Sequence, residues 1–481
     1  MFRCYGAAFA VLLATGCGTV GPDYARPELA TPPAWSAAGE SLTATPAALD
    51  AWWERFEDPR LTDLVLRAME ANLELRVALD RVAEARAARG VVGADLVPRI
   101  DVRGDYSRRQ NGRETVAGGF GPRRNDLFSF GFDASWELDL WGRVRRGVEA
   151  ADAEVEVAIE DARDVLVTVG AEVALNYVEM RLAQGRRAIA AANVENQQAA
   201  LELARDRFSA GLVSELDVAQ AGANLERTVA SLPTLEIAER AARHRIAVLL
   251  GEAPGALETE LAAFAPVPTP PLEIAVGVPA DLLRRRPDLR RAERELAAAT
   301  ARIGVAEGAL YPRFDLLGSL GVDAQDAGDL FGGRAVGFSI GPSIRWNVFD
   351  RERLLGGVAI EESRTRQTLA RYERSLLGAL EEAENAMIAF LRDRQSREAL
   401  GRALEHARRA DALSRDQYRQ GLVSFQSVVD SQSRRFEIED TLALAAAAIS
   451  LDAISMYKAL GGGWESHDLM PAAAPEEENA R

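Results

Sequence analysis

Hydrophobic and polar residues alternate with a period of two over two long segments of the chain. From Phe128 to Leu140 the even positions are apolar and the odd positions are polar or glycine, and the segment 336–348 repeats this pattern. A period of two places successive side chains on opposite faces of a β-strand. The segments 100–107 and 314–323 alternate less cleanly. The pattern predicts four strands, each with one apolar and one polar face.

Two environments suit such strands. One is a half-buried sheet in a soluble protein. The other is a bilayer, because the strands reach the roughly 9 to 11 residues that a membrane requires, and Trp136, Trp141 and Trp346 lie near strand ends, where aromatic girdles of membrane barrels sit. Four strands cannot close a barrel, and an open sheet edge is not stable in lipid. Membrane-spanning strands would therefore require oligomerisation, and three copies would supply twelve strands.

Long helices are expected after each pair of strands. No proline occurs from Arg143 to Leu232 or from Ser343 to Met470, so both stretches can be helical for most of their length. A helix from Arg143 to about Phe208 would be on the order of 100 Å long. Glycines at 211 and 421 interrupt the two patterns and predict turns that reverse the chain. Each stretch is therefore expected to form a long helical hairpin.

The chain contains two copies of one unit. Residues 96–101 (LVPRID) recur at 310–315 (LYPRFD), and residues 208–214 (FSAGLVS) recur at 418–424 (YRQGLVS), about 210 residues apart in each case. We expect a signal peptide at 1–16, an N-terminal extended segment at 17–50, a first repeat at 51–264 with strands at about 100–109 and 127–140, a proline-rich connector at 265–280, a second repeat at 281–464 with strands at about 314–323 and 336–348, and a C-terminal tail at 465–481.

Composition narrows the class of protein. The 57 basic and 73 acidic residues give a net charge of −16, which argues against a nucleic-acid binder because such proteins carry a basic patch or stripe. Beyond Leu13 no charge-free apolar run reaches the roughly 18 residues of a membrane-spanning helix, so a helical transporter is excluded. Asp133, Glu137 and Asp139 carry part of the acidic charge on the polar face of the strand expected at 127–140, where it would favour cations.

The N-terminus is typical of a secreted protein. Arg3 precedes an apolar stretch, Gly6–Leu13, of the length expected in a signal peptide. Small residues at 14–16 then precede Cys17, as in a bacterial lipoprotein signal, although Ala14 stands where leucine is usual. Cys4 is removed with the signal, so Cys17 has no intramolecular disulfide partner. We expect diacylglycerol and palmitate on Cys17; the alternative is ordinary cleavage, with the cysteine incidental.

At this point the sequence resembles a known family, the TolC-like outer-membrane factors, and within it the lipoprotein branch of tripartite efflux systems. The resemblance is carried by residues 20–27 (VGPDYARP), Trp52-Trp53 with 58–61 (DPRL), 277–293 (GVPADLLRRRPDLRRAE) and the two glycine turns. It implies a mixed α and β fold: a homotrimer with a twelve-stranded β-barrel in the outer membrane, in contact with lipid, continued by a periplasmic α-helical barrel. It also implies passive conduction, with an inner-membrane pump, commonly of the resistance-nodulation-division class, and a periplasmic adaptor as partners.

The resemblance also implies functional positions at the helical hairpins. The two turns would form the adaptor-docking tip, with these residues: Gly211, Leu212, Val213, Ser214, Arg419, Gly421, Leu422, Val423 and Ser424. Asp430 matches an acidic ring that closes the pore in family members, with Asp217 as the candidate from the first repeat. Gln426 stands where leucine is frequent, and Ser433 where arginine is frequent. The alternative is that both aspartates are acidic residues in a helix's first turn, favoured by its dipole.

No motif supports catalysis or a metal site. The three histidines, His244, His406 and His467, lie far apart in the sequence, and neither a P-loop nor a dinucleotide fingerprint occurs. We therefore expect a protein that is not an enzyme and has no metal or cofactor besides the lipid. Two alternatives to small-molecule efflux stay open at this point: the channel of a type I protein secretion system, and a non-conducting periplasmic lipoprotein that acts as a spacer.

Overall fold

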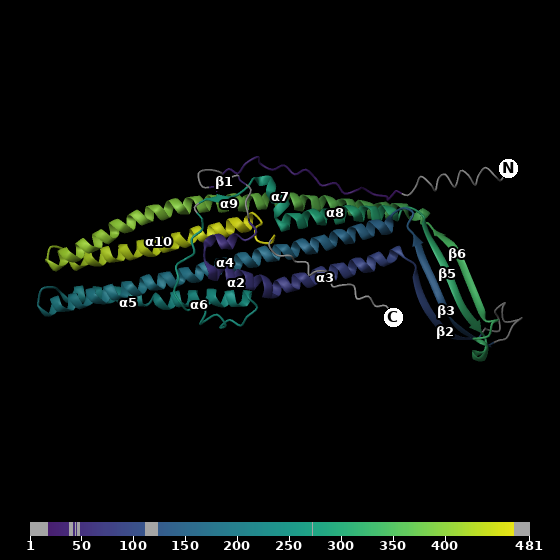
Figure 1. Ribbon diagram of the computed structural model, residues 1–481, viewed down its shortest axis with the longest axis horizontal. Helices are drawn as coiled ribbons and strands as arrows, with labels where there is room; N and C mark the ends of the chain where they lie inside the picture. The colour runs from purple at the N-terminus through teal and green to yellow at the C-terminus, as the bar shows by residue number, and fades with distance from the viewer. Residues whose placement is uncertain are drawn as a thin grey trace. The chain divides into compact units, whose positions relative to one another are not determined.

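The computed structural model describes residues 18–37, 42–43, 45, 49–110, 124–271 and 273–465 (Figure 1). The expected signal peptide, Cys17 and the expected C-terminal tail beyond Glu465 lie outside the described residues. The helices are α2 (Pro59–Ala71), α3 (Leu73–Gly93), α4 (Arg143–Ser209), α5 (Glu215–Val229), α6 (Leu232–Leu249), α7 (Leu282–Arg285), α8 (Pro287–Gly308), α9 (Arg351–Arg419) and α10 (Phe425–Ala459). The strands are β1 (Leu42–Thr43), β2 (Arg99–Gln110), β3 (Arg124–Leu138), β4 (Ile274–Ala275), β5 (Arg313–Ala324) and β6 (Val336–Arg345).

The chain divides into two compact units, and both draw on both repeats. Among the residues that the structure describes, the sheet unit draws on the ranges Met1–Glu28, Arg81–Ala158 and Arg291–Glu373, and the helical unit on Leu29–Asp80, Ile159–Arg290 and Arg374–Arg481. The long helices α4 and α9 contribute residues to each unit. The expected helix from Arg143 is α4, and it extends over 67 residues.

The sheet unit is built on four antiparallel strands in the order β2-β3-β5-β6 (Figure 1). The register places residues of similar polarity opposite one another. Val102, Phe132, Leu320 and Phe338 form one row across the strands, and Arg103, Gly131, Gly321 and Gly337 form the next. Because adjacent rows point to opposite faces, the sheet has one apolar and one polar face. The two outer strands, β2 and β6, each leave an edge that no described strand covers.

Two strand ends differ from the sequence expectation. The segment 336–348 was expected to be one strand, but β6 ends at Arg345, and Val348–Asp350 form a 3₁₀ turn. The segment 127–140 is β3, which begins earlier, at Arg124, and ends at Leu138. The last three residues of β3 pair with β5 alone, whereas the corresponding end of β6 lies on the uncovered edge and has no strand beside it.

The apolar face of the sheet is exposed to solvent in the single chain. Phe338 is 81% exposed and Ile340 74%, at positions where the sequence alternation calls for burial. A contiguous apolar surface of this kind indicates contact with a membrane or another protein. The alternation therefore does not produce a half-buried sheet of a soluble domain.

The helical unit contains two hairpins, in which α5 returns beside α4 and α10 beside α9 (Figure 1). Gly211 and Gly421 have φ of +72° and +76°, a conformation that glycine adopts without strain. The amide of Leu212 donates to the carbonyl of Arg207 at 2.9 Å, and that of Leu422 to the carbonyl of Gln417 at 2.9 Å. Both turns are thus Schellman motifs that end one helix and redirect the chain into the next.

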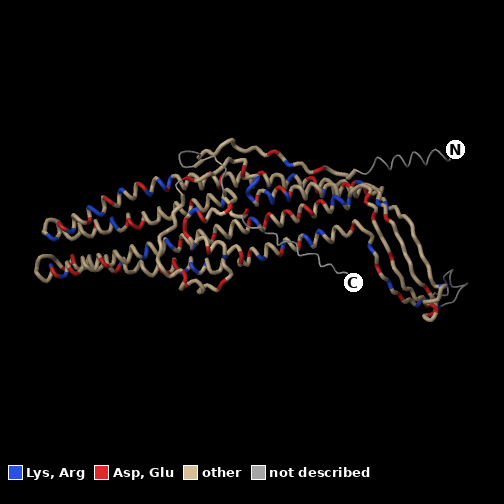
Figure 2. Tube along the Cα trace, viewed as in Figure 1, with Lys and Arg blue, Asp and Glu red and all other residues tan. Residues whose placement is uncertain are grey.

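The second arm of the C-terminal hairpin has an apolar segment. By length and composition alone α10 could cross a membrane, but 44% of that window is already buried inside the protein. Elsewhere on the long helices acidic and basic residues are interleaved (Figure 2). We assign α10 to the packing of the helical unit.

The N-terminal segment is fixed to the base of the sheet. The amide of Val20 donates to the carbonyl of Trp141 at 2.9 Å, and the buried Arg146 donates to the carbonyls of Val20 and Gly21 at 3.0 and 3.2 Å. A Cβ on Gly21 would lie 2.3 Å from the Cα of Gly304, so only glycine permits this approach. Residues 20–27, which carried part of the family resemblance, therefore serve as a strap across the sheet unit.

The arginine-rich segment 277–293 has a structural role at the start of α8. Arg286 donates to the carbonyl of Ala459 at 2.8 Å, to the carboxylate of Asp288 at 3.0 and 2.8 Å, and to Glu382 at 2.8 Å. Its side chain is 12% exposed. One guanidinium thus joins the beginning of α8, the middle of α9 and the end of α10.

Candidate functional site

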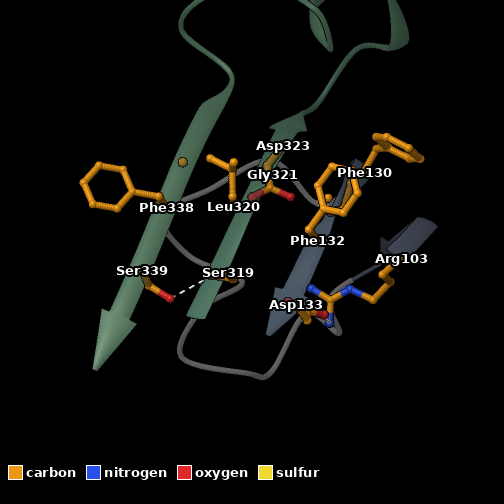
Figure 3. A pocket seen from close by; sticks show the side chains of 13 residues that line it. Arg103, Phe130, Phe132, Asp133, Ser319, Leu320, Gly321, Asp323, Phe338 and Ser339 are labelled. Carbon is orange, nitrogen blue, oxygen red and sulfur yellow. Dashed lines mark hydrogen bonds and ion pairs between the residues drawn. The ribbon is translucent and has the colours of Figure 1, made fainter. Parts of the chain in front are cut away.

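The sheet carries a cavity of about 270 Å³ (Figure 3). Small and charged residues of the polar face line it together with Phe130, Phe132, Leu320 and Phe338. Arg103 of β2 contacts the carboxylate of Asp133 at 3.3 Å, and the hydroxyls of Ser319 and Ser339 are 2.8 Å apart. At the glycine row the backbones of β3 and β5 approach each other closely. A Cβ on Gly131 would lie 2.6 Å from the carbonyl oxygen of Leu320, so this position requires glycine.

The expected acidic lining of this face is neutralised by arginines. Asp133 pairs with Arg103, and Glu137 pairs with Arg143 at 2.6 Å and with Arg313 at 3.2 Å. Asp139 accepts from the amides of residues 144 and 145, at the start of α4, and from the Arg145 side chain at 3.3 Å. These carboxylates therefore supply little net charge. The expected preference for cations does not follow, because arginines neutralise these carboxylates. The sequence pattern identified the acids but not their arginine partners.

Three tryptophans lie at the end of the sheet that joins the long helices. The indole of Trp136 donates to the carbonyl of Leu96 at 3.1 Å, and that of Trp346 to the carbonyl of Leu310 at 3.1 Å. These are the same contact in the two repeats. Trp141 donates to the carbonyl of Pro312 at 2.8 Å and stacks on Tyr311 with ring centres 4.9 Å apart. Paired indole N–H groups leave the rest of each ring for apolar contact, as in an interfacial belt.

At the turns, the two hairpins contact each other through Arg207 and Tyr418. Arg207 donates to the carbonyl of Tyr418, and its guanidinium carbon lies 4.5 Å from the centre of the Tyr418 ring. Tyr418 is buried in an apolar cluster with Phe425, whose ring centre is 5.3 Å away. Burial, and then the nearby charge of Asp217, raise the pKa of the Tyr418 hydroxyl. Residues from α4, α5, α9 and α10 thus meet at one point.

The sequence did not identify Arg207 or Tyr418 as site residues. Tyr418 aligns with Phe208 in the repeat, yet Tyr418 is buried and Phe208 is 46% exposed. The sequence does show an arginine, Arg207, directly before Phe208, and an aromatic residue at both equivalent positions, 208 and 418. A repeat alone does not reveal that one copy of an aromatic is buried between hairpins and the other exposed.

The structure separates the gate candidates into two groups. Asp217 lies in the first turn of α5, and its charge contributes to the raised pKa of the Tyr418 hydroxyl. Asp430 is exposed on α10, and its carboxylate accepts from the side-chain amide of Gln426 at 2.7 Å. Because α10 begins at Phe425, Asp430 lies in the second turn, and a first-turn dipole effect does not account for it.

The docking candidates surround the two turns. Leu212 and Leu422 are 66% and 69% exposed, whereas Val213 and Val423 pack partly against the cluster of Tyr418 and Phe425. Ser214 and Ser424 occupy the positions just before α5 and α10. Arg419, the arginine of the second turn, pairs with Asp416 at 3.2 Å. Each turn therefore presents one exposed leucine beside polar residues.

A pair of acids lies between α9 and α10 in the helical unit. Burial, and then the charge and hydrogen bond of Asp393, raise the pKa of Asp452 from its usual value of 3.8 to about 7. The corresponding positions in the first repeat are Ala183 and Ala242, both buried. The acid pair is therefore a property of the second hairpin alone.

We expect Asp452→Asn to raise thermal stability at pH 8 and to raise it clearly less at pH 5. The pKa of Asp452 is higher in the folded chain than in the unfolded chain, so this group lowers the unfolding free energy as pH rises from about 4 to 7. A raised pKa of this size in a half-buried group corresponds to about 1 to 2 kcal/mol after allowance for solvent. Circular-dichroism melts at both pH values measure this, with the exposed Asp416→Asn as control. An equal gain at pH 5 would contradict the titration.

Comparisons with known proteins agree with this architecture. The family model described as "Outer membrane efflux protein" matches residues 64–252 and again residues 278–462. Nodulation protein T of Rhizobium leguminosarum bv. trifolii is 31% identical over 92% of this chain and 94% of its own. The pyoverdine export outer membrane protein OpmQ of Pseudomonas aeruginosa is 30% identical over 95% of this chain and 96% of its own. The solved structure of the outer-membrane channel OprN has a TM-score of 0.87 and 36% identity, and the match covers 93% of this chain and all of that one.

The family model covers most of both repeats. The match to the solved OprN structure covers the sheet and the long hairpins together, in one chain. The chain belongs to the outer membrane efflux protein family, the TolC-like outer-membrane factors.

Proposed function

We propose that this protein is the outer-membrane channel of a tripartite efflux pump and conducts small toxic compounds passively to the exterior. The observation that carries the proposal is the four-stranded sheet with one exposed apolar face, one polar face and two uncovered edges. Lipid would cover the apolar face, and solute would pass along the polar face. The family members are efflux channels and not enzymes, and the charge-paired sheet suits passive conduction.

The channel would be a homotrimer whose sheets together make a twelve-stranded barrel. Both uncovered edges need hydrogen-bond partners in a bilayer, and a second copy of the sheet offers both. Exposed Phe208 supports the same assembly in the helical unit, because its counterpart Tyr418 packs between hairpins of one chain. Phe208 would pack in the same way against the next copy. The helical hairpins would then form the periplasmic barrel.

The lipid anchor would sit at the bilayer surface. Val20 and Gly21 are held at Trp141 and Arg146, and Cys17 lies only a few residues before them in the sequence. Trp136, Trp141 and Trp346 would form the periplasmic-side girdle of the barrel. Acyl chains on Cys17 would therefore enter the membrane beside this girdle, without a long spacer.

The turns would be the docking tip for a periplasmic adaptor, which in turn binds an inner-membrane pump of the resistance-nodulation-division class. Leu212 and Leu422 are exposed where an adaptor could cover them. In a trimer, Asp430 with Gln426, and Asp217 with Tyr418, would lie around the narrow end of the pore. The choice of substrate would rest with the pump, because the paired charges of the sheet favour neither sign of solute.

Conductance across planar bilayers tests the proposal. We expect the wild-type protein to insert as a mostly closed channel, and Asp430→Ala to increase both its conductance and the entry of large antibiotics into cells severalfold. Three carboxylates brought together by a three-fold axis recruit a cation, and alanine removes this bridge together with the contact to Gln426.

The matched control is Asp416→Ala, which removes an exposed carboxylate next to the same turn and should leave conductance unchanged. Equal conductance of Asp430→Ala and wild type would refute the gate. An absence of conductance in every variant would refute the channel itself and favour a spacer.

A further inference from the structure

The two halves of the sheet are equivalent residue by residue. Arg99 lies opposite Ser135 in the β2–β3 pair, and its counterpart Arg313 lies opposite Arg345 in the β5–β6 pair. Trp136 and Trp346 confirm this alignment, because each indole donates to the carbonyl of the equivalent leucine at 3.1 Å. β2 therefore corresponds to β5, and β3 to β6, with a known match at every position.

One pair of neighbouring strands in the sheet joins the first repeat to the second, and we call such a pair a junction. β3 of the first repeat pairs with β5 of the second, with Asp133 opposite Ser319 and Glu137 opposite Asp315. In a closed ring of alternating repeats the next junction of this kind joins β6 of one copy to β2 of another. These are the two strands whose outer edges are uncovered.

We infer that β6 pairs with β2 of a second copy of this chain in the register of the β3–β5 junction, so that Ser343 lies directly opposite Asp105. Ser343 corresponds to Asp133, and Asp105 corresponds to Ser319. The same correspondence sets Asn347 opposite Asp101 and Trp346 opposite Val102, and every apolar side chain stays on the apolar face. This inference rests on the proposed trimer and adds its register.

The early end of β6 has a direct explanation in this register. Trp136, Glu137 and Leu138 are strand residues because they pair with β5, and β2 does not reach them. Their counterparts are Trp346, Asn347 and Val348, where the apolar–polar alternation continues but the strand has stopped. Trp346 and Val348 are 55% and 52% exposed. A neighbouring β2 would give these residues the partner that β5 gives to β3, and β6 would then extend to Val348.

The register also places two carboxylates, as well as one like charge, beside Arg345 on the polar face. Arg345 is exposed, with no carboxylate within 4.0 Å among the residues that the structure describes. In the inferred register it lies opposite Arg103 of the neighbouring copy, with Asp101 and Asp105 diagonally on either side. Diagonal neighbours on adjacent strands are within reach of a long side chain. Arg345 would thus gain two carboxylates from the next chain.

Cysteine pairs measure the register. We would prepare the full-length lipoprotein with Ser343→Cys and Asp105→Cys together and oxidise it mildly in membranes. Directly opposite residues have Cα atoms about 4.5 to 5.5 Å apart, within disulfide range, and diagonal residues about 7 to 8 Å, outside it. We expect the Ser343→Cys, Asp105→Cys protein to appear mainly as a covalent trimer on non-reducing gels.

Two pairs shifted by two residues, on the same face, serve as controls: Ser343→Cys with Arg103→Cys, and Ser343→Cys with Ser107→Cys. Both should stay at the level of the single-cysteine proteins, which also report any reaction of Cys17. A covalent trimer from a shifted pair, and not from the matched one, would overturn the register while keeping the trimer. A native trimer with no crosslink in any pair would overturn the β6–β2 junction, and a monomer in mild detergent would overturn the proposed assembly as well.

Discussion

Arg286→Ala is expected to lower the stability of the helical unit by about 3 kcal/mol and to reduce sharply the amount of protein in the outer membrane. The side chain donates to Ala459, Asp288 and Glu382, and alanine leaves two carboxylates and a helix-terminal carbonyl without this partner. Breaking a buried charge pair costs about 3 to 5 kcal/mol, and the partial exposure of Asp288 sets the lower end of that range here. Circular-dichroism melts and membrane fractionation measure both effects.

Arg284→Ala is the matched control, because Arg284 belongs to the same arginine run but is exposed. It should melt within about 0.5 kcal/mol of wild type. Arg286→Lys should recover only part of the loss, since an ammonium group cannot reproduce the planar bidentate contact with Asp288. Equal stability of the alanine variants at 284 and 286 would show that the contacts of Arg286 do not stabilise the helical unit.

This segment illustrates what the sequence reveals and what it withholds. The arginine-rich run was specific enough to indicate the family, yet its partners are far along the chain, at residues 382 and 459. No local pattern predicts such pairs. The strands behave in the opposite way, because the alternation from Phe128 onward is itself the physical cause of the two-faced sheet. The four strands and the long helices were therefore predictable.

The polar face and the tip required the structure. Acidic residues at 133, 137 and 139 predicted a negative lining, but their arginine partners come from other strands and from α4. Likewise, Phe208 and Tyr418 occupy equivalent positions in the repeat and have opposite environments in one chain. In the proposed trimer such differences arise because a single copy supplies only one of the two junctions that each repeat makes.

Arg207→Ala is expected to open the tip. Each chain would lose a charge-assisted hydrogen bond to the carbonyl of Tyr418 and a cation–π contact with its ring, together worth about 2 kcal/mol at this half-buried site. If the proposed trimer opens in concert, the three losses add to about 6 kcal/mol. A shift of about 5.5 kcal/mol takes a two-state equilibrium from 1:99 to 99:1. A rarely open channel would thus become a mostly open one.

Single-channel recording measures this change as open probability, and the uptake of a large antibiotic by cells measures it in vivo. Arg205→Ala is the control, since Arg205 is exposed two residues earlier on the same helix and should not alter gating. Tyr418→Phe keeps both the carbonyl and the ring, so its open probability should stay near wild type, whereas Tyr418→Ala should resemble Arg207→Ala. An open probability of Arg207→Ala equal to that of Arg205→Ala would show that this contact does not hold the hairpins closed, even if the protein still conducts.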